Sequence, residues 1–296
     1  VQSFHIHFKY GQGTRGSNLS NKLKFYEARY KQLGNVSSQL FYFWPMIALQ
    51  NITIIGNGSV GQYLQRNLSL HNYDIKVVTR DRGPSKSFQE KLASLKGTTD
   101  LIVICVSDQA IAEVSTFIGV GNAPVVHVSG ATPLHHLSDK HAHRGIWYPL
   151  MSLAAGTNPT FTSIPFCLEA TDEFTMQLLK QLTRAMGATA YEVDSEQRKV
   201  LHLAAVLAQN FSNHLYELAY LEMAKAGLDF ELLKPLLLQS VSRLGKDHPA
   251  KMQTGPAVRK DQNTIHQHQK MISNQDTLEI YNIMTQSIQK RHDKEL

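Results

Sequence analysis

Three glycines early in the sequence have the spacing of a phosphate-binding loop. The run GNGSVG follows the apolar segment 52–55 and precedes a helix-like segment that reaches Leu70. In a G-x-G-x-x-G loop the first glycine makes a tight turn, the second lets the backbone approach a pyrophosphate, and the third lets helix and strand pack closely. Backbone N–H groups at the helix start then bind the phosphate. The sequence therefore predicts dinucleotide binding by Gly56, Asn57, Gly58, Ser59, Val60 and Gly61.

The second apolar segment, 75–80, ends in residues that select between dinucleotides. Thr79 and Arg80 offer a hydroxyl and a cation, which suit the 2′-phosphate of NADP. An NAD-binding protein usually has an acidic residue at this place, and Asp81, one residue further along, is the alternative as a ribose ligand. We expect NADP, with further cofactor contacts from the residues at the end of the third strand, Val106, Ser107 and Asp108.

Hydride transfer also needs a group that donates a proton to the substrate as charge develops. His202 and Asn210 interrupt an apolar helical segment, and spacing in multiples of four places them on one helix face, with Asn213 beside them. Ser129 and Gly130 follow another strand, where they offer a hydroxyl and close backbone approach. We expect His202, Asn210 and Ser129 to be catalytic, and Ser129, Gly130 and Asn213 to contact the substrate. The alternatives are a buried histidine with helix-packing asparagines, and a plain loop turn.

The segment 254–261 breaks the helical pattern with glycine and proline and concentrates polar groups. Arg259 is expected to bind a substrate carboxylate or phosphate, because its planar guanidinium binds such groups bidentately. Asp261 is expected to help bind the substrate by holding that arginine. Capping of the helix that begins near Gln262 is the alternative role for Asp261.

Four histidines between residues 135 and 143 suggest a metal site, but they lack regularly spaced acidic or cysteine companions. We interpret this stretch as a solvated loop and predict no metal. The two cysteines, Cys105 and Cys167, lie in apolar strand-like runs without metal-ligand spacing. Buried thiols in a reducing cytoplasm are the expected state.

Strand-like and helical segments alternate through the first two thirds of the sequence. The strands are expected at 52–55, 75–80, 100–106, 124–128, 164–170 and 189–193. This alternation predicts an α/β fold, a Rossmann-type doubly wound and mostly parallel sheet, over residues 46–194. From residue 195 to 296 the pattern becomes all-helical, beginning with one long helix at 195–226. The catalytic residues are expected in a cleft between these two domains.

The charge of the protein is concentrated in its first 45 residues. These hold six basic side chains and one acidic one, whereas the net charge of the whole chain is +6. The remainder is nearly neutral and has no basic stripe with interleaved aromatic residues, so nucleic-acid binding is not expected. Residues 1–45 show no sustained periodicity, and we interpret them as a poorly ordered extension or a start site set too early. The apolar run at 40–49 is too short to span a membrane.

Taken in order, several motifs resemble the Rossmann-like proteins with a C-terminal domain of unknown function, DUF2520. These proteins are related to 6-phosphogluconate dehydrogenase, ketopantoate reductase and pyrroline-carboxylate reductase. The motifs are GNGSVG (56–61), VSD (106–108), HVSGA (127–131), GIWYPL (145–150), RKVLHLAAVLAQNFSNHL (198–215) and TGPAVRKD (254–261), followed by His268. The resemblance implies an NADP-binding oxidoreductase fold whose substrate is not assigned. It also implies a homodimer, because related dehydrogenases dimerise through their helical domains.

The sequence departs from the β-hydroxyacid members of this superfamily at one place. Those members carry a lysine and an asparagine one turn apart on the first long helix. Here Arg198, His202, Val206 and Asn210 occupy successive turns, so a direct copy of that mechanism is not expected. An NADP-dependent reductase for a small anionic substrate is our leading interpretation. An F420-dependent NADP oxidoreductase and a non-catalytic NADP-binding regulatory protein are the alternatives.

Overall fold

The computed structural model describes residues 49–80, 85–95, 97–153 and 159–293. The chain divides into two units, one that ends at Leu203 and one that begins at Ala204. The extension predicted for residues 1–45 lies outside the described residues, as does Asp81.

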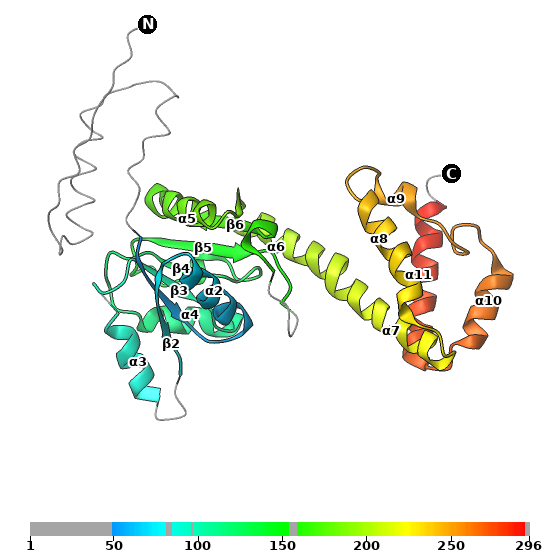
Figure 1. The fold of residues 1–296 in the computed structure, drawn as a ribbon, viewed down its shortest axis with the longest axis horizontal. Coiled ribbons are helices and arrows are strands. Elements are labelled where there is room, and N and C mark those ends of the chain that lie inside the picture. The colour runs from blue at the N-terminus through cyan, green and yellow to red at the C-terminus, as the bar shows by residue number, and fades with distance from the viewer. Residues whose placement is uncertain (1–48, 81–84, 96, 154–158, 294–296) are drawn as a thin grey trace, which may run out of the picture. The chain divides into compact units, whose positions relative to one another are not determined.

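Seven strands of the first unit form one sheet, in the order β2-β1-β3-β4-β5-β6-β7 (Figure 1). Strands β1 to β5 pair in parallel, β6 is antiparallel to β5, and β7 is parallel to β6. This arrangement confirms the predicted α/β fold with a mostly parallel sheet. The strands are β1 (Asn51–Ile55), β2 (Asp74–Val78), β3 (Leu101–Ile104), β4 (Val125–His127), β5 (Arg144–Pro149), β6 (Pro165–Ala170) and β7 (Thr189–Glu192).

Helices cover both faces of the sheet, because the central strands are apolar on both sides. Leu64 and Leu179 pack helices α2 and α5 against one face. Leu92 and Ile111 pack α3 and α4 against the other face, and Leu201 of α6 packs on the same side over β5 and β6. The bounds are α2 (Ser59–Leu70), α3 (Ser85–Ala93), α4 (Asp108–Phe117), α5 (Glu173–Ala185) and α6 (Ser195–Ala205).

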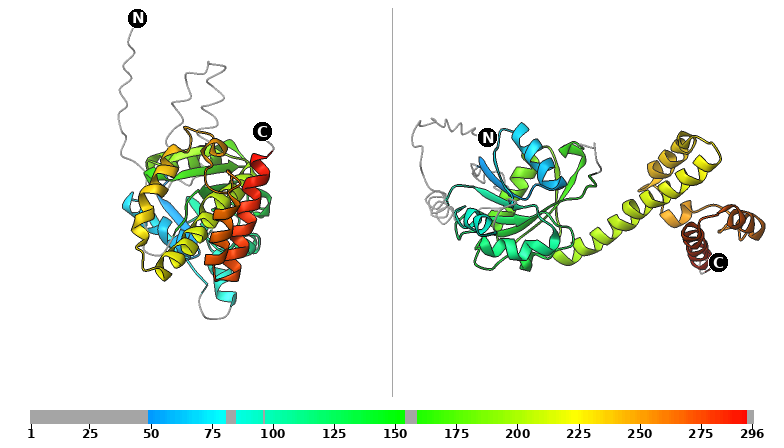
Figure 2. Two further views of the ribbon diagram at one scale, coloured as in Figure 1. Left: turned by 90° about the vertical axis from the view of Figure 1, so that its right-hand side faces the viewer. Right: turned by 90° about the horizontal axis from the view of Figure 1, so that it is seen from below.

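The second unit is helical, as predicted, and is drawn from yellow-green to red in Figure 2. Among its described residues only Ala257 and Ile265 are buried. None of the helices that the structure describes combines the length and apolar character needed to cross a lipid bilayer. The elements are η4 (Val206–Asn210), α7 (Phe211–Lys225), η5 (Phe230–Leu233), α8 (Lys234–Arg243), α9 (Pro249–Met252), α10 (Gln262–Met271) and α11 (Gln275–His292).

The long helix predicted at 195–226 is not a uniform α-helix. Its segments α6 and α7 are joined by a single π-helical segment, η4. A π-turn accommodates one extra residue, so the residues after it are out of phase with a regular 3.6-residue repeat. Asn210, which was assigned to a face by uniform helical spacing, is the last residue of that segment.

Two strands also differ from the prediction. Strand β2 was predicted as an apolar strand at 75–80, but it is an edge strand over Asp74–Val78 with exposed side chains at Asp74 and Lys76. Strand β5 was not predicted, although it lies inside the sheet and five of its six residues are buried. Its sequence, RGIWYP, begins with a charged residue and ends in proline, so it lacks the continuous apolar run of β3.

Candidate functional site

The glycine-rich loop joins β1 to α2, and its three glycines have different surroundings. Gly56 has a φ of 107°, and a Cβ there would lie 2.3 Å from the carbonyl oxygen of Cys105. A Cβ at Gly61 would lie 2.6 Å from the carbonyl oxygen of Gly56. At Gly58, by contrast, a Cβ would meet no heavy atom within 4 Å. The first and third glycines are therefore required by the loop's own packing, whereas the second leaves open space beside the backbone.

Helix α2 presents uncapped backbone N–H groups at this loop. Its N-cap, Gly58, has no side chain to accept a hydrogen bond from them, and the first turn of the helix contains no acidic residue. Asn57 and Ser59 are exposed, and Val60 is half-buried. The positive end of the helix dipole and the free N–H groups make this a favourable place for a phosphate.

The loop lies at the point where the strand order reverses. The connection from β1 leads to β2 on one side, whereas β3 pairs with β1 on the other. Ligands of open α/β sheets bind outside the carboxyl ends of the strands at such a point. Val106 follows β3, Ser107 is the N-cap of α4, and Asp108 begins that helix, with the last two exposed. The structure thus places these three predicted cofactor contacts next to the glycine loop.

Thr79 and Arg80 follow β2 at the same edge of the sheet. Thr79 is half-buried and Arg80 is exposed. The Arg80 guanidinium carbon lies 5.8 Å from the ring centroid of Phe88 on α3, a cation–π distance that helps to orient it. The Arg80 side chain is exposed, as a ligand for an anion requires.

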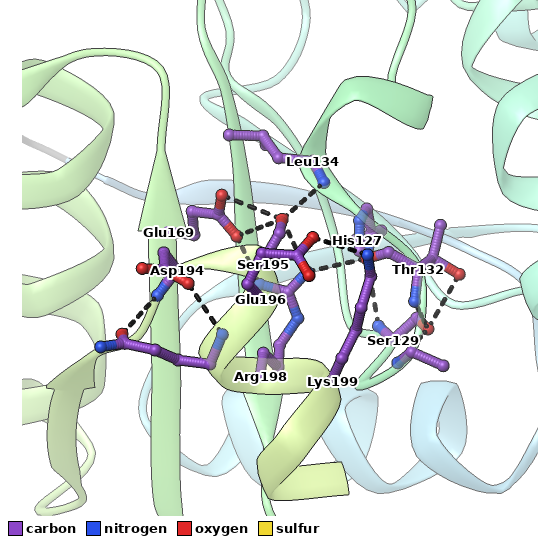
Figure 3. Close-up of polar contacts among 12 residues, drawn as sticks. His127, Ser129, Thr132, Leu134, Glu169, Asp194, Ser195, Glu196, Arg198 and Lys199 are labelled. Carbon is purple, nitrogen blue, oxygen red and sulfur yellow. Dashed lines mark hydrogen bonds and ion pairs between the residues drawn. The ribbon is translucent and has the colours of Figure 1, made fainter. Parts of the chain in front are cut away.

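The hydroxyl of Ser129 closes the loop that follows β4 (Figure 3). It accepts hydrogen bonds from the backbone N–H groups of Ala131 (3.1 Å) and Thr132 (2.9 Å), and it donates to the Thr132 hydroxyl at 3.0 Å. The side chain is buried. Its interactions are those of a serine that fixes a turn, which is the alternative that the sequence left open for this residue.

His127 supports this loop from inside the sheet. Its ring is fully buried, and Nδ1 accepts a hydrogen bond from the Ser129 backbone N–H at 3.1 Å. Burial, together with the positive charge of Arg198, lowers the pKa of His127 to about 3. The imidazole is therefore neutral at neutral pH, and its role is structural.

Gly130 is packed against two polar side chains, Tyr148 of β5 and His202 of α6. A Cβ at Gly130 would lie 2.6 Å from Tyr148 Cζ and 2.9 Å from His202 Nδ1. The Tyr148 hydroxyl lies 3.5 Å from His202 Nδ1, and the two rings meet edge to face. Tyr148 is 9% exposed, whereas His202 is half-buried. The structure thus brings predicted residues Gly130 and His202 together, and adds a tyrosine beside them.

An ion pair with a fully buried arginine anchors the start of α6 (Figure 3). Arg198 is fully buried, and one guanidinium nitrogen donates to the Glu169 carboxylate on β6. The other guanidinium nitrogen donates to the Thr132 carbonyl at 2.8 Å. The Ser195 hydroxyl donates to the same carboxylate at 2.8 Å and accepts from the Leu134 N–H at 3.1 Å. Helix α6 is therefore fastened both to the sheet and to the loop that carries Gly130.

The remaining predicted residues belong to the helical unit. Asn210, Asn213 and Arg259 are exposed. Asp261 is the N-cap of α10, where its carboxylate accepts from the Thr264 N–H at 3.1 Å and from the Thr264 hydroxyl at 2.7 Å. These hydrogen bonds lower the pKa of Asp261. Capping was the alternative role for this residue.

Among the described residues, no group of three or more histidine, cysteine or acidic side chains has metal-binding geometry. The interpretation of the four histidines as a solvated loop is wrong for His141. That ring is buried, and its Nε2 lies 2.9 Å from the Ser115 carbonyl oxygen. Both cysteines are free and buried, as predicted.

Sequence reasoning missed Tyr148, Glu169 and the role of Arg198. Tyr148 was quoted inside the GIWYPL motif without a function, because strand β5 was not predicted. The available signal for Glu169 was an acidic residue at the end of an otherwise apolar strand run. The available signal for Arg198 was a charged residue one turn before His202, on the helix face that packs against the sheet.

Comparison with known proteins places this geometry in a wider context. Residues 164–288 match the family model described as a domain of unknown function, DUF2520. No protein with a curated functional description matches the sequence. A solved structure from Bacteroides fragilis, with the provisional description NADP oxidoreductase, is 29% identical with a TM-score of 0.71, and the match covers 81% of this chain and 98% of that one.

Two more distant structures share the fold. A protein from Thermotoga maritima is 21% identical with a TM-score of 0.57, over 82% of this chain and 99% of that one. Pyrroline carboxylate reductase from Plasmodium falciparum, solved with NADP bound, is 14% identical with a TM-score of 0.51, over 82% and 98% of the two chains. The chain therefore carries a DUF2520 domain in its C-terminal region and has the fold of the Rossmann-like reductases.

Proposed function

We propose that the protein is an NADP-dependent oxidoreductase that acts on a small, anionic substrate. The observation that carries this proposal is the glycine loop at the switch point of the sheet, with open space at Gly58 and an uncapped helix start behind it. The likeness to the Bacteroides fragilis protein described as an NADP oxidoreductase supports it. When bound, the cofactor supplies a hydride to the substrate or accepts one from it.

The residues of the chain fit the cofactor in three places. The N–H groups at the start of α2 bind the pyrophosphate, and Arg80 with Thr79 binds the 2′-phosphate. Val106, Ser107 and Asp108 line the path from the pyrophosphate toward the end of β4. At the end of β4, His202 and Gly130 form the part of the site that faces the substrate. The group that donates the proton belongs to the same part of the site. Asn210 is a further catalytic residue in the proposal, and Asn213 and Arg259 are further substrate ligands. The exposed guanidinium of Arg259 is the ligand for a carboxylate or phosphate.

Gly58 provides the sharpest test of cofactor binding. Because a Cβ there meets nothing within 4 Å, Gly58→Ala is expected to fold, with a small loss of stability because alanine is a poorer N-cap than glycine. The added methyl group occupies the space through which a pyrophosphate approaches the backbone, so NADPH affinity is expected to fall about tenfold or more. Fluorescence titration with NADPH measures this effect, and Ser69→Ala, at the exposed far end of α2, is the control. Unchanged NADPH affinity in a folded Gly58→Ala protein would contradict the proposal.

Turnover distinguishes an enzyme from a regulatory NADP-binding protein. NADPH oxidation is measured with 2-oxo acids, cyclic imines and F420 as separate acceptors. We expect turnover with one of the first two classes. NADPH binding without turnover of any acceptor would favour the regulatory alternative, and turnover with F420 alone would favour the deazaflavin alternative.

The proposed assembly is a homodimer formed through the helical unit. That unit has two buried side chains among its described residues, far fewer than ninety residues need for a stable core. A second copy of the same unit supplies the missing apolar cover. The exposed apolar side chains of the unit include Leu207, Phe211, Leu215, Leu221, Leu232, Leu236, Leu238, Val241, Leu244, Ile283 and Met284.

Light scattering at micromolar concentration tests the assembly. We expect the mass of a dimer for the unaltered protein and a shift toward monomer for Phe211→Glu. Leu70→Glu is the matched control, because Leu70 is an exposed leucine on α2 of the first unit. A monomeric unaltered protein would refute the dimer.

A further inference from the structure

Tyr148 is a phenol at the carboxyl end of a parallel strand, in contact with a histidine that reaches solvent. The Tyr148 hydroxyl lies 3.5 Å from His202 Nδ1, at the outer limit of a hydrogen bond. The phenol is 9% exposed, and the imidazole is half-buried. Both contact Gly130, which follows the end of β4, where open α/β sheets bind the reacting part of their ligands.

We propose that Tyr148 donates the proton to the substrate in the reductive direction, and that His202 replaces that proton from solvent. The inference rests on the proposed oxidoreductase function, and it makes His202 a proton relay behind the donor. In this arrangement His202 Nδ1–H donates a hydrogen bond to the phenol oxygen, and the phenol O–H points to the substrate.

The environment of Tyr148 keeps the phenol protonated until the reaction occurs. Burial is the largest influence that raises the pKa of Tyr148, the nearby thiol of Cys167 and carboxylate of Asp108 raise it further, and Arg198 acts in the opposite direction. A protonated phenol can act as a general acid, whereas burial in this partly apolar site disfavours its phenolate. The phenolate formed by donation therefore has a strong tendency to regain a proton.

His202 is suited to return that proton because its two ring nitrogens face different surroundings. Nδ1 faces the buried phenol, and the half-buried ring gives the imidazole access to water. A neutral imidazole can release a proton from Nδ1 and accept one at Nε2, so it moves a proton across its ring without a lasting change in charge. A phenol alone at this depth would depend on direct entry of water for the same exchange.

Three features hold the two rings in this geometry. Gly130 has no Cβ, and any Cβ there would lie within 3 Å of both side chains. Arg198, one turn before His202 on α6, fixes the helix to the Glu169 carboxylate and to the Thr132 carbonyl. Tyr148 is fixed by the sheet, since it pairs with Cys167 across strands β5 and β6. Arg198 is a positioning residue and does not contact the substrate in this proposal.

The proton balance of the proposed step is complete. The carbonyl or imine carbon gains the hydride, while the oxygen or nitrogen gains the phenol proton as its double bond to carbon is reduced. The Tyr148 oxygen then takes the Nδ1 proton, and Nε2 of His202 takes one from water. Exchange of the ring protons with solvent then returns His202 to its Nδ1-protonated tautomer before the next turnover, with no net change in protons. One proton from solvent is consumed in each reduction, and NADPH is the reductant.

The tautomer of His202 tests the pair independently of turnover. Protein labelled with ¹⁵N-histidine is examined by NMR at pH 8, and His202→Gln identifies the resonances. We expect a protonated Nδ1 in the unaltered protein, and a change to the Nε2-protonated form in Tyr148→Phe. Tyr63→Phe is the matched control, because Tyr63 donates to the Pro159 carbonyl on the opposite face of the sheet. An unprotonated Nδ1 in the unaltered protein, or no change in Tyr148→Phe, overturns the relay.

Kinetics tests the chemical role on the same proteins. With NADPH and the acceptor that the panel of 2-oxo acids and cyclic imines identifies, kcat of Tyr148→Phe is expected to fall about 10²-fold or more, with little change in NADPH affinity. Tyr63→Phe is expected to retain full kcat. Equal kcat in Tyr148→Phe and the unaltered protein overturns the inference. Failure of the unaltered protein to bind NADPH refutes the proposed function instead, and the NMR result still decides whether the two rings form the pair.

Discussion

Arg198 and Glu169 form an ion pair in which the arginine is completely buried and the carboxylate partly buried, with side-chain exposures of 0% and 18%. The pair joins α6 to β6, and the Ser195 hydroxyl satisfies a further lone pair of the carboxylate. Removal of one partner leaves an uncompensated charge in a largely apolar setting, which typically costs about 3–5 kcal/mol.

We therefore expect Arg198→Met to lower the free energy of unfolding by about 3 kcal/mol or more. The double variant Arg198→Met/Glu169→Leu is expected to lose less than the sum of the two single losses, because it leaves no unpaired charge. Urea unfolding of the four proteins in the cycle measures the difference. Additivity within about 0.5 kcal/mol would show that the two side chains are not energetically coupled.

His127 makes stability depend on pH. Its pKa is lowered from 6.5 to about 3 by burial and by Arg198, so the unfolded chain takes up a proton below pH 6.5 that the folded protein does not. The contribution of His127 to the free energy of unfolding is therefore fully present above pH 6.5. It is lost as the pH decreases toward 3, by up to about 1.4 kcal/mol per pH unit.

In His127→Asn this contribution is expected to disappear, because an amide oxygen can still accept the Ser129 N–H but does not titrate. Urea midpoints between pH 4 and pH 7 are compared for the two proteins. The same pH slope in both would assign the acid sensitivity to other groups.

Arg80 is expected to determine the cofactor preference. Loss of one charge-assisted contact to the 2′-phosphate costs about 1.5–3 kcal/mol, so Arg80→Ala is expected to weaken NADPH binding tenfold or more. NADH binding is expected to stay the same. Lys76→Ala, which removes an exposed cation from the same edge strand, is the control. An unchanged ratio of NADPH to NADH affinity in Arg80→Ala would show that Arg80 does not bind the 2′-phosphate.

Asp261 can be tested for its two roles separately. Asp261→Ala removes the N-cap of α10 and is expected to lower the stability of the protein, whereas Asp261→Ser retains a capping oxygen and most of that stability. Chemical unfolding gives these values. If KM for the substrate rises in both variants, the carboxylate also serves binding; if it changes in neither, capping is its whole role.

The sequence was sufficient to predict those parts of the fold whose conformation is determined by residues close together in the chain. The continuous apolar run of β3 and the glycine spacing at 56–61 each determine a local conformation, and the structure contains both. Strand β5 was missed because its burial comes from its neighbours β4 and β6 rather than from its own composition. The π-turn η4 was missed because it differs from an α-helix by one hydrogen-bond step, which the apolar repeat does not reveal.

The candidate site was predictable only in part, for a related reason. His202 stands out as a polar residue in an apolar helix, but its neighbour Tyr148 depends on the register of β5 and the position of α6. Arg198 would normally be placed on the solvated face of a helix, since arginine is seldom fully buried. Its burial follows from an acidic partner on β6 that lies 29 positions away in the sequence.

The scarcity of buried side chains in the helical unit has a consequence for its exchange with solvent. Amide hydrogens exchange when local opening exposes them, and the free energy of opening is low where few apolar contacts must be broken. In diluted protein the amides of α7, α8 and α11 are therefore expected to exchange with deuterium faster than those of β1, β3 and β4. Raising the protein concentration should slow the helical amides and leave the sheet unaffected, since mass action favours the proposed dimer, in which a second copy covers the helices.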